Sequence, residues 1–221
     1  EEVRVAGAEA AQGLLGVIGK ETFPRLVRPC TASLRSVISL SSVGSPPGLG
    51  VPKGVLPLAQ VLIQGLLQAT SSELRLDAAE GLADLIGAST PTALKPHVLL
   101  ITGPLIRIIG DRFPPELKAA ILRALGLMVD KGGVALRPFV PQLQTSFFKC
   151  LLDEDRKVRG RAAANLGELA ELSARFATLA TDLTTHALQA DRDSELPEGY
   201  LRALRGLLHG NAGAKLPGDV L

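Results

Sequence analysis

Apolar residues recur along the middle of the chain with the spacing of amphipathic helices. The clearest segments begin at Leu74, Leu117 and Val158, and each of these residues is followed by a cation. Counted from that first residue, positions 4, 5, 8 and 11 are apolar in every segment: Ala78, Ala79, Leu82 and Leu85; Ile121, Leu122, Leu125 and Met128; Ala162, Ala163, Leu166 and Leu169. Offsets of 0, 4, 8 and 11 fall on one stripe of a helix with about 3.6 residues per turn. The pattern predicts three helices that each bury one face.

These segments repeat at a nearly constant distance, with steps of 43 and 41 residues. A second helix precedes two of them, since the strings Leu94-Lys95-Pro96 and Leu136-Arg137-Pro138 align at a step of 42. Two antiparallel helices per roughly 40 residues is the period of HEAT or armadillo repeats. No run of alternating polarity indicates a strand. The sequence therefore predicts an all-α fold, an α-solenoid of HEAT-type antiparallel helix pairs, with about four to five pairs.

The two ends of the chain follow the repeat less closely. Val3 begins the same pattern, and Leu196 continues it with Pro197 in place of the cation. Residues 41–54 are rich in Ser, Gly and Pro and are not expected to form a helix. We therefore expect three parts: degenerate N-terminal repeat helices (1–40), a loop (41–54), and HEAT repeats forming a partner-binding region (55–221).

Composition and charge narrow the class of protein. Hydrophobic residues make up 46% of the chain, which excludes disorder over most of its length. The 24 Lys+Arg nearly balance the 22 Asp+Glu, which argues against a dedicated nucleic-acid binder. Two distant cysteines suggest neither a disulfide framework nor a zinc site, so we expect a reduced, intracellular protein. No apolar stretch reaches the ~18 residues of a membrane span. The chain begins with Glu1 and reads as mid-helix, so we expect a segment of a longer protein without a signal peptide.

No group of residues suggests catalysis. The three histidines share no metal-ligand spacing, and the glutamate pairs at helical spacing are typical of a solvated helix face. Residues 48–54 satisfy neither common phosphate-loop pattern. We therefore expect no catalytic residue, no metal site and no cofactor.

A few residues of the repeat are candidates for binding a partner protein. Arg107 is the only cation in the apolar run 103–111, and helical geometry points it away from the core. Lys149 holds the equivalent place 42 residues on, so stacking would set the two cations on one ridge. A cation is also favoured near a helix C-terminus by the helix dipole. Phe139 lies four residues before Leu143, and it could pack in the core or contact a partner.

Two strings add a resemblance. Residues 101–113 (ITGPLIRIIGDRF) and 135–145 (ALRPFVPQLQT) resemble the large HEAT-repeat translational activator of general amino-acid control. The resemblance implies a non-catalytic, cytoplasmic scaffold region. It would bind the RWD domain of the kinase that phosphorylates the alpha subunit of initiation factor two, and promote its activation on ribosomes during amino-acid starvation. The arginine implicated in kinase binding matches Arg107, and the phenylalanine of the second string matches Phe139. Lys149 and Arg112 complete the predicted protein-binding set.

Two other classes remain open. An importin-like or phosphatase-scaffold solenoid would bind peptides or proteins, although the absence of Trp counts against it. An enzyme would need a convergent set of reactive side chains, and none can be named. Direct nucleic-acid binding by this segment is unsupported by its charge balance, so ribosome contact is expected through the full-length protein.

Overall fold

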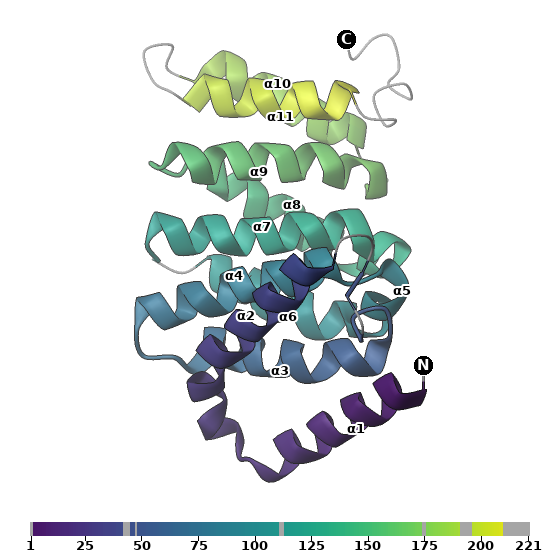
Figure 1. Cartoon of the computed structure of the whole chain (residues 1–221). Coiled ribbons are helices and arrows are strands. Elements are labelled where there is room, and N and C mark those ends of the chain that lie inside the picture. Colours follow the sequence, from purple (N-terminus) through teal and green to yellow (C-terminus); the bar gives the residue numbers. More distant parts are fainter. Residues whose placement is uncertain are drawn as a thin grey trace. The chain divides into compact units, whose positions relative to one another are not determined.

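The computed structural model describes residues 2–41, 45–46, 48–110, 113–173, 176–190 and 196–209. Within these residues every regular element is a helix (Figure 1). The chain divides into two compact units, residues 1–132 and residues 133–221, and each is described by itself. The predicted all-α fold of HEAT-type helix pairs is confirmed.

The first unit holds two antiparallel helix pairs preceded by two further helices. Its elements are α1 (Glu2–Val17), η1 (Lys20–Thr22), α2 (Phe23–Leu40), α3 (Pro52–Gln68), α4 (Ser72–Ala88), α5 (Pro91–Leu94), η2 (Lys95–His97), α6 (Val98–Ile109) and α7 (Pro115–Gly132). Helix α3 packs against α4, α6 packs against α7, and α4 lies beside α7. The unit is thus a short stack in which the second helices of successive pairs are neighbours.

The second unit repeats this arrangement. Its elements are η3 (Gly133–Phe139), α8 (Val140–Cys150), α9 (Arg156–Leu169), η4 (Ala170–Leu172), α10 (Phe176–Gln189) and α11 (Leu196–His209). Helix α8 packs against α9, α10 against α11, and α9 against α11. Gly133 has a φ of 51°, a left-handed conformation that favours glycine, at the point where η3 begins.

The apolar stripe that defines the repeat forms the core. All its predicted positions in α4, α7 and α9 are buried, except that Leu74 is only half-buried. Val3, which begins the same sequence pattern, lies outside this core. Helix α1 packs mainly against α3, and Val3 and Leu14 are 85% and 64% exposed. A matching sequence pattern is not sufficient for burial when no neighbouring helix covers that face.

Helix starts are fixed by side-chain caps and by proline. Asp155 accepts hydrogen bonds from the backbone N–H groups of Lys157 (2.8 Å) and Val158 (3.1 Å), so it caps α9. Ser71 caps α4 in the same way through the N–H of Leu74. Helix α3 begins at Pro52, inside the segment 41–54, because proline fits the first helical position, where its missing N–H is not needed.

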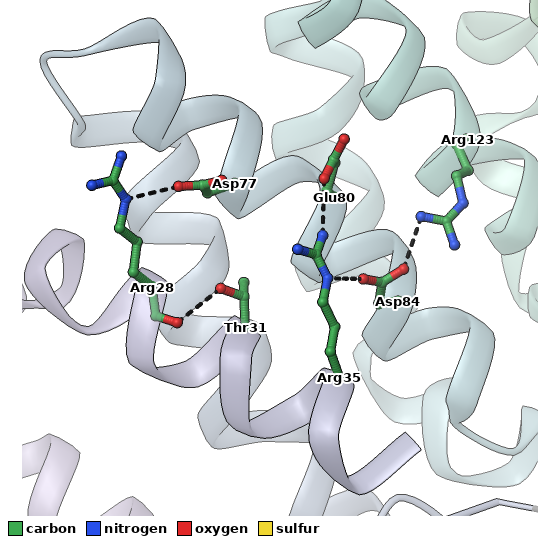
Figure 2. Close-up of polar contacts among 7 residues, drawn as sticks. All are labelled: Arg28, Thr31, Arg35, Asp77, Glu80, Asp84 and Arg123. Atoms are coloured by element: carbon green, nitrogen blue, oxygen red, sulfur yellow. Dashed lines mark hydrogen bonds and ion pairs between the residues drawn. The ribbon is translucent and has the colours of Figure 1, made fainter. Parts of the chain in front are cut away.

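Helix α2 lies across the pair α3 and α4 and is joined to α4 by ion pairs (Figures 1 and 2). The Nε of Arg28 lies 2.9 Å from a carboxylate oxygen of Asp77. Two helical turns further along α2, guanidinium nitrogens of Arg35 lie 2.9 Å from carboxylate oxygens of both Glu80 and Asp84. Exposed pairs of this kind contribute only about 0–1 kcal/mol each. They therefore fix the register of α2 on α4 more than they stabilise the contact.

Close approach of the two helices depends on glycine. The side chain of Thr31 on α2 is buried over Gly81 of α4, and a Cβ built on Gly81 would lie 2.2 Å from the Thr31 Cγ2. A Cβ on Gly65 of α3 would lie equally close to the Cγ2 of Val27. Van der Waals contact between carbon atoms needs about 3.5–4.0 Å. Only glycine at these two positions allows α2 to lie this close.

The C-terminal end of α4 is completed by a side chain from α7. The Lys131 ammonium donates to the carbonyl oxygens of Ile86 (3.1 Å) and Ser89 (2.9 Å), and also to that of Gly87. Ile86 and Gly87 lie in the last turn of α4 and Ser89 is its C-cap, a region where helical N–H donors run out. The Ile86 oxygen also accepts from the Ser89 N–H (3.3 Å). Burial lowers the pKa of Lys131, and the nearby Asp130 partly opposes this.

One described stretch, Pro91–Ile109, passes a length and hydropathy test for a membrane span. Half of it is buried inside the protein, and it is divided by the 3-10 turn of η2. Both properties are typical of a core segment, which is how α5 and α6 pack in the first unit.

Candidate partner-binding surface

Arg107 lies in the last turn of α6 with its side chain exposed. The buried face of the same helix is aliphatic and includes Ile101, Leu105 and Ile108. Among the described residues Arg107 has no hydrogen bond and no ion pair. The orientation predicted from helical geometry is therefore the one observed, and the guanidinium is available to another molecule.

The surface around Arg107 is apolar. Leu99 and Leu100 are 65% and 38% exposed, and a Cβ on Gly103 would meet no atom within 4 Å. Leu100, Pro104 and Arg107 follow one another at helical spacing, so they share a stripe. An exposed apolar strip that ends in one cation is typical of an interaction site.

The exposed leucines were not predicted from the sequence. The sequence does indicate them in one way: nearly every residue of α6 is apolar, although one side of the helix faces solvent. A helix that is hydrophobic all round is normally buried, so such a helix at a surface has unpaired apolar area.

Lys149 is exposed in the last turn of α8, beside a pocket of the second unit. The pocket has a volume of about 320 Å³ and is lined by Gln144, Thr145, Phe148, Lys149, Leu152, Asp182, His186 and Tyr200. The imidazole of His186 stacks on the Tyr200 ring and meets Phe148 edge-on, with both ring-centre distances 5.6 Å. Burial raises the pKa of Tyr200. Lys149 thus lies at the rim of an aromatic hollow.

The other predicted residues differ in placement. Phe139 is half-buried at the start of α8, whereas Leu143 and Phe147 on the same helix are fully buried. Arg112 lies outside the described residues. Arg107 belongs to the first unit and Lys149 to the second, so the ridge of stacked cations stays a prediction.

The remaining polar candidates have structural environments. The ring Nε2 of His97 donates to the carbonyl oxygen of Pro52 at 2.9 Å, which ties η2 to the start of α3. Cys150 is buried, as its place in the repeat predicts. Burial raises the pKa of Cys30, which disfavours the reactive thiolate. Within the described ranges no three His, Cys, Asp or Glu side chains gather as metal ligands.

Comparison with known proteins agrees with this architecture. The HEAT-like repeat family matches residues 114–169. A protein of Arabidopsis thaliana named ILITYHIA is 45% identical over 206 residues, covering 90% of this chain and 8% of that protein. The stalled ribosome sensor GCN1 of Mus musculus is 44% identical over 171 residues, covering 77% of the chain and 6% of the relative.

A fungal relative matches over nearly the whole chain. The eIF-2-alpha kinase activator GCN1 of Saccharomyces cerevisiae is 38% identical over 223 residues, covering 98% of this chain and 8% of the relative. The chain therefore spans less than a tenth of the length of these relatives. The resemblance seen in residues 101–113 and 135–145 is confirmed: the chain is homologous to a segment of the GCN1 proteins and contains a HEAT-like repeat.

Proposed function

We propose that this chain is a non-catalytic scaffold module of a cytoplasmic translational regulator. It binds the RWD domain of the kinase that phosphorylates initiation factor two alpha. Through the full-length protein it promotes activation of that kinase on ribosomes during amino-acid starvation. The proposal is supported by relatives named as an eIF-2-alpha kinase activator and as a stalled ribosome sensor.

Arg107 is the observation that carries the proposal. Its guanidinium is exposed and has no partner among the described residues, and the exposed Leu100 lies two turns earlier on the same stripe of α6. A carboxylate that reached it would form a charge-assisted, bidentate pair. Leu100, on the same stripe, would add apolar contact with the partner, and arginine is a typical hot-spot residue of protein interfaces.

The mechanism needs no chemistry in this chain. Holding the kinase and its activating complex on one scaffold raises their effective concentration toward each other. A stack of helix pairs suits this role because its rigid core keeps the docking side chain in a fixed orientation.

The test is a pull-down of the kinase's RWD domain with wild-type chain and the Arg107→Glu variant. We expect the variant to lose binding while its helicity and Tm stay near those of the wild type. Lys95→Glu is the matched control, because Lys95 is an exposed cation only a few turns away. Arg107→Lys separates the need for a guanidinium from the need for charge. Wild-type affinity of the Arg107→Glu variant would contradict the proposal.

A further inference from the structure

Helices α4 and α9 carry a surface stripe at the same repeat positions but with different charges. On α4 the stripe is acidic: Glu73, Asp77, Glu80 and Asp84. On α9 the positions 84 residues later, at the same place in the repeat, are Lys157, Arg161, Ala164 and Glu168. Both sets have the spacing 4, 3, 4, which places their members on one helix face. The first half of the stripe is therefore negative on α4 and positive on α9.

The stripe on α4 already has an occupant. Helix α2 carries Arg28 and Arg35 seven residues apart, and they pair with Asp77 and Asp84, which are also seven residues apart (Figure 2). The first unit therefore shows how this part of the repeat receives a helix: the helix lies across it and presents side chains of opposite charge.

The stripe on α9 continues onto α11. The two helices run parallel, since Arg156 pairs with Glu198 at 3.2 Å and, further along both helices, a Cβ on Gly167 would lie 3.0 Å from the backbone of Gly206. Helix α11 lies beside α9 (Figure 1). A Cβ on Gly160 of α9 would lie 3.0 Å from an Arg202 guanidinium nitrogen, and Arg205 follows Arg202 by three residues, on the same side of α11.

Three cations of this surface are available for pairing. Lys157, Arg161 and Arg205 are exposed and form no ion pair among the described residues. Arg156 and Arg202 differ, because both share the carboxylate of Glu198. The second unit carries equal numbers of acidic and basic residues, 11 of each, so these cations are a local concentration and not part of a general basic excess.

We propose that α9 and α11 form a docking surface for an acidic amphipathic helix of another protein. The charges that this helix presents are opposite to those that α2 presents to α4, and the helix lies over the exposed cations of α9 and α11. Its carboxylates pair with Lys157, Arg161 and Arg205. This surface is independent of Arg107 and of the proposed RWD contact.

The composition of the surface favours a protein over RNA. Glu168 and Glu198 interrupt the basic stripe, and a continuous phosphate backbone would meet both carboxylates. Single-stranded RNA is usually held by exposed aromatic side chains as well as cations. Tyr200, the only aromatic residue of α11, is buried. Discrete carboxylates on a helix can avoid the two glutamates, whereas evenly spaced phosphates cannot.

The test is fluorescence anisotropy with the whole chain and a labelled peptide. The probe is an alanine-based helical peptide of about 18 residues, the length of α2, with glutamates at alternating spacings of four and three. We expect it to bind, with affinity that falls as salt is added. The same peptide with lysines in place of the glutamates should not bind.

Two triple variants locate the site. Lys157→Glu, Arg161→Glu and Arg205→Glu together should weaken binding by about tenfold or more, because complementary charges become repulsive. The matched control reverses three exposed cations of the first unit, Arg25, Lys95 and Arg107, and should bind within about twofold of the wild type. Since the control includes Arg107→Glu, failure of the RWD contact and failure of this surface are distinguishable.

A second readout guards against misfolding. Far-UV circular dichroism should be unchanged in both triple variants, and the neutral variant with Lys157, Arg161 and Arg205 changed to Gln should also lose affinity. Equal binding by both triple variants would overturn the proposal, as would equal binding of the lysine peptide. Binding of a single-stranded RNA of about 20 nucleotides in place of the acidic peptide would overturn it too.

Discussion

The contact between Thr31 and Gly81 gives the sharpest test of how α2 is held on α4. In Gly81→Ala the new Cβ would lie 2.2 Å from the Thr31 Cγ2 and 3.1 Å from a Leu62 methyl. The first distance is short of van der Waals contact by more than about 1 Å. Helix α2 must therefore move away from α4, and the pairs made by Arg28 and Arg35 must stretch with it.

The expected magnitude comes from two opposing effects. Replacing glycine by alanine inside a helix stabilises it by about 1 kcal/mol when the new methyl meets no obstacle. Overpacking costs about 1–3 kcal/mol. We expect the free energy of unfolding of Gly81→Ala to be about 0–2 kcal/mol lower than that of the wild type. Gly13→Ala in α1 is the control, because its Cβ meets nothing within 4 Å and no proline follows it, and it should be about 1 kcal/mol more stable.

A compensating change makes the interpretation specific. Thr31→Ser removes the obstructing methyl and keeps the hydroxyl that donates to the Arg28 carbonyl at 3.0 Å. The double variant Thr31→Ser, Gly81→Ala should have a free energy of unfolding about 1–2 kcal/mol higher than the value expected by adding the effects of the two single changes. Urea unfolding followed by far-UV circular dichroism measures these differences, since the chain has no Trp and one Tyr. Equal stabilisation by Gly81→Ala and Gly13→Ala, or strict additivity in the double variant, would refute the reasoning.

Three further predictions concern single polar groups. Thr102→Val should raise the free energy of unfolding by about 1 kcal/mol, because the buried Thr102 hydroxyl has no partner in the described part of the chain; a loss of stability in urea would contradict this. Asp84→Ala should lower the free energy of unfolding by about 1 kcal/mol in low salt, because this carboxylate, 15% exposed, pairs with both Arg35 and Arg123. The loss should shrink at high salt, and a loss that does not depend on salt would argue against the ion pairs. The hydrogen bond from Arg156 lowers the pKa of Glu198 in the folded protein, so the pair stabilises the fold at pH values above the pKa of this carboxyl in the unfolded chain. This stabilisation is lost as the pH falls through the folded-state pKa. An NMR titration should show the pKa of Glu198 rising in Arg156→Ala, and an unchanged pKa would contradict the assignment.

The repeat itself could be predicted from the sequence because it depends on local spacing. The repeat positions on the inner face of each second helix are apolar and fully buried, as at Leu82 of α4, Leu125 of α7 and Leu166 of α9. The position of α2 could not be predicted in this way. Arg28 and Asp77 are 49 residues apart, and their pairing depends on how the chain turns between α2 and α3. Thr31 has the sequence character of a surface residue, and it is buried because Gly81 lies opposite.

Part of the candidate site could also be predicted from the sequence, and part could not. The exposure of Arg107 follows from its angle on α6 relative to Leu105 and Ile109. The hollow beside Lys149 does not follow from any local pattern, because His186 and Tyr200 come from two later helices. A pocket assembled across repeats is visible only once the helices are packed.

Lys131 has a consequence for how the first unit folds. The last carbonyl groups of α4 obtain their donor from α7, so the earlier helix pair is finished only when the later one is in place. In linear repeat proteins such nearest-neighbour coupling determines whether repeats melt singly or as a block. The two pairs of this unit should therefore unfold in one cooperative transition. A chain shortened to end before Lys131 would remove this ammonium from the carbonyl oxygens of Ile86, Gly87 and Ser89 at the end of α4.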